Sequence, residues 1–250
     1  MIYKHKFINI QVVWFNENSL IDENADMVIY RQVKNQIKNA EKFHTLIIDL
    51  TQTEEEIFNT FSKSNRKEIR KAIKQDNLVY RMYNSDITRT LLDDFLKAQH
   101  NFAKERNLGE ISKAEFMEYY LNQQLYISTI REKDGEIISW RVHIVDNNRP
   151  RALVSNSFFI NQDKEYKNLV GRASRLMRMQ DIFYFKEKGM KIYDFGGWYA
   201  GHEDTKKLAI NKYKEGFAEK KEISYNYSKC VSIKCYIFKL LVYVKGRIFA

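Results

Sequence analysis

Residues 151–195 carry a strand pattern, then a long helix pattern, then a second strand pattern, and this order restricts the fold more than any other feature of the chain. Arg151 to Phe159 is predicted to be a strand, Leu169 to Lys188 a helix, and Met190 to Phe195 a strand. Gly189 stands directly after the helix, where a left-handed cap favours glycine. A connection of this length between two strands predicts a parallel or splayed pair in one sheet.

The segments before residue 151 predict the rest of a mixed sheet. Leu125 to Arg131 and Glu136 to Val145 have strand patterns, and turn-forming residues at 133–135 and 146–150 predict an antiparallel meander with the strand that follows. Earlier in the chain, the patterns predict strands at Lys6–Phe15, Met27–Val33 and Thr45–Leu50 and helices at Glu54–Lys74, Ile87–Phe102 and Ser112–Gln124. The expected fold class is α/β with a mixed sheet.

The chain shows no sign of a linker between domains. It has one proline and nine glycines among 250 residues, and neither repeats nor low-complexity tracts interrupt it. We therefore expect a main domain over residues 61–250, preceded by a strand-rich extension or degenerate half-domain over residues 1–60.

Charge and cysteine content restrict the partners and the compartment. The 42 Lys and Arg residues exceed the 32 Asp and Glu residues by ten, which favours an anionic partner such as a phosphorylated cofactor, RNA or a membrane surface. The two cysteines, Cys230 and Cys235, have no second pair or nearby histidine with which to form a metal site, so no metal is expected. This cysteine usage fits a reducing cytoplasm best.

Neither end of the chain has the pattern of a membrane-crossing segment. Residues 1–15 lack an uninterrupted apolar region and a small-residue cleavage site, so we do not expect a signal peptide. Val231 to Phe249 is apolar but contains four basic residues, Lys234, Lys239, Lys245 and Arg247. It either lies on a membrane surface or completes the core. The core is favoured, because these basic residues would not gather on one face of a helix.

Three segments have residue patterns that suit phosphate or ligand binding. Arg66, Arg70 and Lys74 recur every four residues on a predicted helix, so they form a stripe that grips phosphates or a solvated basic face. Near the predicted helix start at Leu169, Gly171 and Ala173 would let a pyrophosphate approach free amide groups. Arg172, Arg175 and Arg178 add positive charge to that helix. The third segment ends a strand on two glycines, which leave room beside the chain: Asp194, Phe195, Gly196, Gly197 and Trp198.

Four sequence segments taken in order resemble the Fem-type aminoacyltransferases and their single-domain relatives, which belong to the GNAT superfamily of acyltransferases. They are RKEIRKAIK from Arg66, GRASRLMRMQDIFYFKEKG from Gly171, YDFGGW from Tyr193 and YKEGF from Tyr213. The resemblance covers about residues 61–217. It implies a GNAT-like catalytic domain in which two central strands splay apart and the acyl donor lies between them, here within residues 151–159 and 190–195.

The resemblance also implies roles for individual residues. Tyr213 and Lys214 would lie at the acyl junction, where Lys214 neutralises developing negative charge or a donor phosphate. Asp194 would orient the attacking amine or take its proton, unless it is structural; His143 and His202 are further candidate bases. The segment around Gly171 approximates the GNAT pyrophosphate loop, although Asn168 departs from its first position. Donor-binding candidates are Gly171, Arg172, Ala173, Arg175, Gly196 and Gly197, and substrate-binding candidates are Arg66, Arg70, Lys74, Trp198 and Lys212.

Three functions remain open at this point. The first is transfer of an acyl group from acyl-CoA to an amine of a nucleotide- or lipid-linked amino sugar or peptide, a cell-envelope precursor. The second is Fem-type transfer from an aminoacyl-tRNA, which the basic charge favours and the missing helical arm opposes. The third is a non-catalytic module that binds RNA or anionic lipid. For each, the expected location is the cytoplasm, with contact to the inner membrane face through the C-terminal segment as an option.

Overall fold

The computed structural model describes residues 1–133, 135–157, 163–218 and 220–248, and the side chains up to residue 243. Contacts divide the chain into two compact units. Unit 1 comprises residues 1–43, 112–122 and 223–250, and unit 2 comprises residues 44–111 and 123–222. Each is described separately below. The predicted domain boundary at residue 60 stays a prediction.

The chain forms ten strands and seven helices within its described parts. The strands are β1 Ile2–His5, β2 Ile8–Trp14, β3 Met27–Val33, β4 Glu41–Asp49, β5 Leu78–Tyr83, β6 Leu125–Glu132, β7 Ile137–Asp146, β8 Arg149–Ser157, β9 Ile192–Gly197 and β10 Lys220–Cys230. The helices are α1 Glu54–Thr60, α2 Lys63–Gln75, α3 Arg89–Arg106, α4 Lys113–Leu121, α5 Lys164–Glu187, α6 Thr205–Glu215 and α7 Ile233–Ile248. The predicted α/β class with a mixed sheet is confirmed.

Two helix predictions need correction. The predicted helix Glu54–Lys74 is two helices, because Phe61 takes an extended conformation and the Ser62 hydroxyl caps a new helix by accepting from the Asn65 amide. The helix expected to begin near Leu169 begins at Lys164, capped by Asp163. The end of the predicted strand Arg151–Phe159 lies outside the described residues, as does part of the turn at 133–135.

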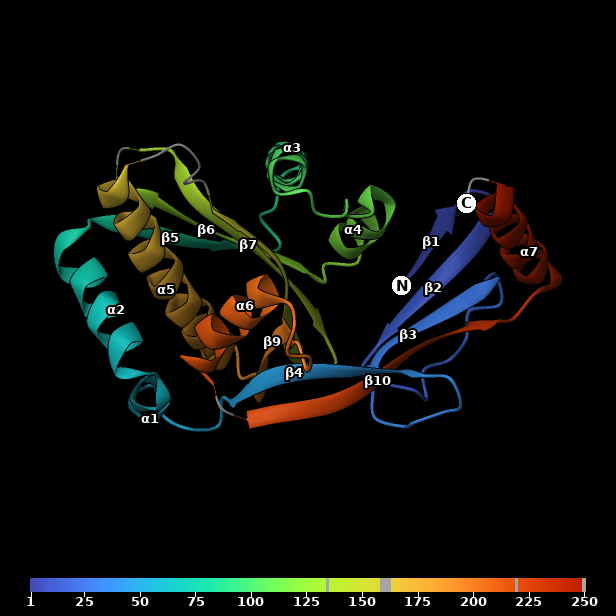
Figure 1. The fold of residues 1–250 in the computed structure, drawn as a ribbon, viewed down its shortest axis with the longest axis horizontal. Helices are drawn as coiled ribbons and strands as arrows, with labels where there is room; N and C mark the ends of the chain where they lie inside the picture. Colours follow the sequence, from blue (N-terminus) through green and yellow to red (C-terminus); the bar gives the residue numbers. More distant parts are fainter. Residues whose placement is uncertain (134, 158–162, 219, 249–250) are drawn as a thin grey trace. The chain divides into compact units, whose positions relative to one another are not determined.

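Unit 2 is built on the strand order β4-β9-β8-β7-β6-β5. The strands β6, β7 and β8 form the predicted antiparallel meander. Helix α5 packs along the sheet with α2 beside it (Figure 1). Its apolar side chains Met177, Ile182 and Phe185 are fully buried in a core shared with the sheet. Burial of such side chains contributes about 2 kcal/mol each to folding, so α5 is held firmly against the strands that carry the candidate site.

Unit 1 contains the strand order β1-β2-β3-β10, in which β2 and β3 run parallel and the other neighbours antiparallel. Helix α4 is fixed to β3 by the Arg31 guanidinium, which pairs with both carboxylate oxygens of Glu115. The Tyr119 hydroxyl donates to Glu115 and accepts from the Trp14 indole. These contacts pair the buried Glu115 carboxylate of α4 with hydrogen-bond donors.

The two cysteines form a disulfide, Cys230–Cys235, between the end of β10 and the first turn of α7. Disulfides persist in oxidising environments. The cysteines therefore give no support to the prediction of a reducing cytoplasm, which assumed unpaired thiols.

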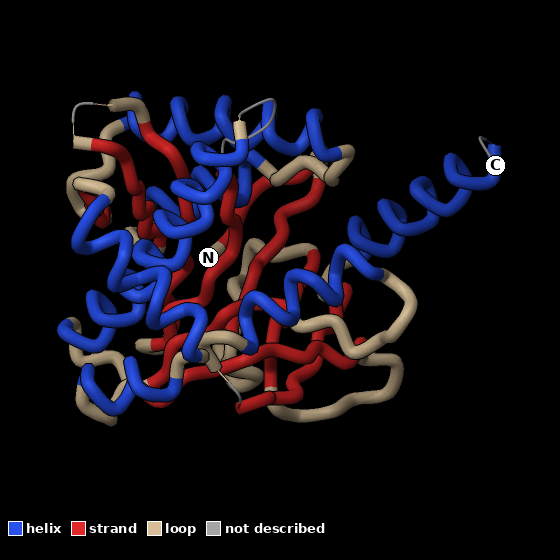
Figure 2. Tube along the Cα trace, turned by 60° about the vertical axis from the view of Figure 1, so that its left-hand side comes forward, coloured by secondary structure: helices blue, strands red, loops and turns tan. Residues whose placement is uncertain are grey.

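Helix α7 does not complete a core, contrary to the favoured interpretation of the C-terminal segment. Ile233 is 79% exposed and Leu240 is 61% exposed, whereas Cys235 is fully buried. The tube drawing shows α7 leading to the C-terminus (Figure 2). Among the helices in the described part of the chain, none has the length and hydrophobicity of a membrane span.

Candidate functional site

The central strands β8 and β9 of unit 2 run parallel but share a single register pair among the described residues, Arg151 with Asp194. This short ladder fits the splayed central pair of the predicted fold. Gly196, two residues after Asp194, has a φ of +71°, and a Cβ there would lie 2.6 Å from the Ala152 carbonyl oxygen. The positive φ and the close approach of β8 both favour glycine at this position.

Asp194 is fully buried and its carboxylate holds the glycine turn. One oxygen accepts from the Thr45 hydroxyl at 2.5 Å and from the Gly196 amide at 2.7 Å. The other accepts from Arg149, which also pairs with Glu222 at 2.6 Å. These contacts satisfy the carboxylate inside the protein. They favour the structural alternative for Asp194 over the role of proton acceptor.

Lys214 contacts the glycine turn. It lies in the last turn of α6, and its ammonium nitrogen donates to the Gly197 carbonyl oxygen over 2.5 Å. Burial lowers the pKa of Lys214 to about 7, with smaller effects in the same direction from the Arg178 and Arg151 guanidinium groups; Asp194 acts in the opposite direction. The neutral amine is therefore much more accessible for Lys214 near neutral pH than for a solvated lysine.

Arg178 belongs to a buried polar network between α5 and the sheet. Its guanidinium donates to the Tyr193 hydroxyl at 2.6 Å, and that hydroxyl lies 2.8 Å from His143 Nε2. Burial lowers the pKa of His143 to about 3. Because His143 is also fully inaccessible, the structure removes the basis for its candidate role as a base. Arg178 Nε is buried and has no hydrogen-bond partner among the described residues.

The other candidate residues near Lys214 in the sequence, Tyr213, Trp198, Lys212 and His202, do not share one environment. The Tyr213 hydroxyl contacts Ser174 on α5, donating to its carbonyl at 3.2 Å. The Trp198 indole donates to Glu215 at 2.8 Å, and the Lys221 ammonium lies 3.8 Å from the Trp198 ring centre. Lys212 and His202 are exposed. The substrate-binding roles of Trp198 and Lys212 stay predictions.

The geometry predicted for donor binding around Gly171 is not present. Gly171 and Ala173 lie in the interior of α5, so their amides belong to the helical hydrogen-bond ladder and are not the free groups of a helix start. Ala173 is fully buried. The Gly171 carbonyl accepts from Arg175, which also donates to Asn65 at 2.9 Å. Arg172 makes a two-pronged pair with Asp76.

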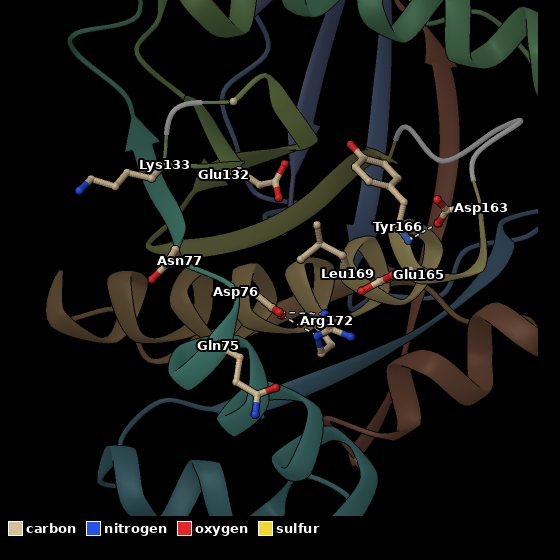
Figure 3. Close-up of a pocket in the computed structure, with 11 residues that line it drawn as sticks. Gln75, Asp76, Asn77, Glu132, Lys133, Asp163, Glu165, Tyr166, Leu169 and Arg172 are labelled. Atoms are coloured by element: carbon tan, nitrogen blue, oxygen red, sulfur yellow. Dashed lines mark hydrogen bonds and ion pairs between the residues drawn. The ribbon is translucent and has the colours of Figure 1, made fainter.

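The actual start of α5 carries negative charge. Asp163 caps the helix by accepting from the Tyr166 amide at 2.8 Å, and Glu165 lies in the first turn. A hollow of about 750 Å³ adjoins this end (Figure 3). Its acidic lining residues are Asp76, Glu132, Asp163 and Glu165, and its basic ones are Lys133 and Arg172. Neither Lys214 nor the glycine turn lines it.

The basic stripe on α2 is only partly free. Arg66 donates to the Asn59 and Phe61 carbonyls, which end α1, and so serves as a helix cap. The Arg70 guanidinium lies 5.3 Å from the Phe58 ring centre but is otherwise exposed. Lys74 is exposed as well, together with Lys67 and Lys71 on the same helix.

Sequence reasoning missed the residues that shape the splay from β8. Arg149 and Arg151 flank the chain's single proline and are both largely buried. Their spacing of two residues in a strand places them on one face, which was a usable signal. Thr45 on β4 and Glu222 on β10 had no such signal, because their pairing with this site depends on contacts far apart in the sequence.

Comparison with known proteins supports the fold. No protein-family model and no curated protein sequence matches this chain. Among solved structures, FemX is similar with a TM-score of 0.59 and 11% identity, over 86% of this chain and 75% of that one. The C-terminal domain of a putative lysylphosphatidylglycerol synthetase from Agrobacterium fabrum has a TM-score of 0.52 and 13% identity, over 81% of this chain and 67% of that one.

A third similar structure is L-PGS from Bacillus licheniformis, with a TM-score of 0.50 and 13% identity over 85% of this chain and 71% of that one. At these identities the likeness concerns the fold alone. It confirms the predicted GNAT-like, Fem-type fold.

Proposed function

We propose that the protein is an N-acyltransferase in which a free amine attacks an activated acyl carbonyl at the opening between β8 and β9. The observation that carries the proposal is the contact of the Lys214 nitrogen with the Gly197 carbonyl, at the point where these strands splay. A lysine in this position stands beside the glycine turn and two buried guanidinium groups, Arg178 and Arg151. The GNAT-like fold supports the same reaction class.

In the proposed reaction the amine nitrogen bonds to the acyl carbon, and the bond from that carbon to the donor's sulfur or ester oxygen breaks. Neutral Lys214 accepts the proton that the attacking nitrogen must lose and returns it to the leaving sulfur or ester oxygen, which restores the neutral amine. Arg178 and Arg151 supply positive potential for the negative oxygen of the tetrahedral intermediate, and Arg178 Nε is a donor without a protein partner in the described structure. Asp194 positions the turn without touching the substrate.

Two donor classes are consistent with this chemistry, and the start of α5 favours aminoacyl-tRNA over acyl-CoA. A helix start that binds pyrophosphate needs free amides and a positive potential. Here Asp163 uses one of those amides, and Glu165 adds a second carboxylate. A tRNA ester needs no pyrophosphate site, and the excess of ten positive charges suits a polyanion.

The proposed acceptor is the amine of a nucleotide- or lipid-linked amino sugar or peptide in cell-envelope synthesis. A lysylphosphatidylglycerol synthetase, by its name, forms a lipid that carries an amino acid, so the shared fold is compatible with aminoacyl transfer to an envelope component. The non-catalytic alternative is less well supported, because binding RNA would not require a lysine with a lowered pKa beside a glycine turn.

Two measurements on the intact chain test the proposal. We expect filter retention of aminoacyl-tRNA and no thermal shift with acetyl-CoA; a shift with acetyl-CoA alone would reverse the choice of donor. With the bound donor and amine acceptors, Lys214→Met should reduce single-turnover transfer by about a thousandfold while retention of the donor stays within about twofold. Equal transfer by Lys214→Met and the unchanged protein would refute the catalytic assignment and favour the binding module.

A further inference from the structure

Helix α7 presents an apolar face to solvent. Ile233, Ile237 and Leu240 recur at helical spacing on this face and are 79%, 50% and 61% exposed. Tyr236 and Tyr243 border it, at 64% and 56% exposure. Isolated exposed apolar residues are ordinary, but a continuous stripe of them on one helix marks an interaction surface.

Unit 1 holds the first turns of α7 through the opposite side of the helix. Cys235 is fully buried and linked to Cys230, and Phe238 packs against His5 and Phe7 with ring centres 5.8 Å and 5.7 Å apart. Asp26 fixes the segment before the helix, since it accepts from the Ser232 hydroxyl, and this bond and the Asn9 amide lower its pKa. The apolar face is therefore held outward by several independent contacts.

The charges around α7 indicate which partner covers this face. The sequence from Val231 to Phe249 contains no Asp or Glu and four basic residues. On a helix with 100° per residue, Lys234 and Lys239 fall at the two edges of the apolar face. Lysines at such edges reach outward to lipid phosphates, while the tyrosines lie at the level of the headgroups.

We propose that α7 is an interfacial helix that docks unit 1 onto an anionic lipid bilayer, with Ile233, Ile237 and Leu240 buried at the headgroup boundary. Basic residues at the flanks of the apolar face suit an interfacial helix, so Lys234 and Lys239 do not need to share one face. A second copy of the chain is a poorer occupant, because two such faces would bring their lysines together. The inference does not depend on the acyl-transfer proposal.

Vesicle co-sedimentation of the intact chain tests the inference. We expect binding to vesicles of phosphatidylcholine with phosphatidylglycerol and much weaker binding to phosphatidylcholine alone. The double variant Ile237→Asn/Leu240→Asn should lower the vesicle–water partition coefficient by on the order of a hundredfold. The double variant Lys234→Gln/Lys239→Gln should lower the same partition coefficient by about thirtyfold, since each lysine near an anionic surface contributes about a factor of five.

A matched control variant distinguishes lipid binding by α7 from nonspecific hydrophobic binding by any exposed apolar residue. Leu20 and Ile21 are exposed in unit 1. The double variant Leu20→Asn/Ile21→Asn therefore makes the same chemical change at another exposed site, and it should bind vesicles like the unchanged protein. Equal losses from both pairs would overturn the proposal. So would vesicle binding that ignores phosphatidylglycerol content, or a dimer in sedimentation velocity that the Ile237 and Leu240 changes dissociate without any vesicle binding.

Discussion

The protonation state of Lys214 decides which catalytic step this residue serves. A charged ammonium stabilises a negative oxygen, whereas a neutral amine accepts a proton. Because burial and two neighbouring guanidinium groups lower the pKa of Lys214 to about 7, the neutral form is well populated at physiological pH. The nearby arginines stay charged and provide the electrostatic role that the sequence had assigned to Lys214.

The pH dependence of transfer should therefore follow Lys214. If the neutral amine is the base, the transfer rate with saturating donor rises as pH increases through about 7 and levels off above it. Lys214→Arg keeps a positive charge but cannot deprotonate, so it should be as inactive as Lys214→Met. Stopped-flow transfer assays between pH 5.5 and 9 give the profile. Activity retained by Lys214→Arg would instead assign the residue an electrostatic role.

Lys214 also links function to stability. Its folded pKa lies below the ordinary value of 10.5, so the unfolded chain binds more protons between about pH 7 and 10.5. The free energy of unfolding therefore rises as pH increases from about 7 to 10.5. Below about pH 7 the full cost of burying a charged Lys214 is present. Loss of activity in Lys214→Met is therefore not expected to come from unfolding, because the change removes that cost.

At the scale of elements, Gly196 allows β8 and β9 to pack closely beside each other. Replacing it by alanine would place a Cβ 2.6 Å from the Ala152 carbonyl at a φ of +71°. We expect Gly196→Ala to lower the free energy of unfolding by about 3 kcal/mol, measured by urea denaturation. Gly109→Ala is the control, since its Cβ would meet nothing within 4 Å, and it should change stability by less than about 0.5 kcal/mol. Similar losses from both would refute a special requirement at Gly196.

Local patterns predicted the meander and the strand–helix–strand order of β8, α5 and β9, because both depend on periodicity, whereas the position of Lys214 near the acyl junction was implied by the family resemblance. Element boundaries were less predictable. Charged residues at 163–167 concealed the first turn of α5, although Asp163 is a favourable cap. Strand β10 has few apolar residues and is held by pairing with β3, about 200 residues earlier, so no local pattern indicated it.

At the scale of the whole molecule, the excess of ten positive charges favours polyanion binding but does not place it. Lys67, Lys71 and Lys74 form an exposed row on α2, in the same unit as the candidate site. Lys34, Lys38 and Lys42 are equally exposed and belong to unit 1. Binding at a defined surface would distinguish these two sets, whereas a general charge effect would not.

We expect the triple change of Lys67, Lys71 and Lys74 to Gln to weaken aminoacyl-tRNA binding by about tenfold or more. It should also make the dependence of log K on log salt shallower by about 2, since each phosphate contact contributes about 0.7 to 0.9. The triple change of Lys34, Lys38 and Lys42 to Gln alters the net charge equally and should leave both quantities nearly unchanged. Filter binding over a series of salt concentrations measures them. Equal weakening by the two triple variants would mean that tRNA is held by net charge alone, and α2 would no longer be assigned as its binding surface.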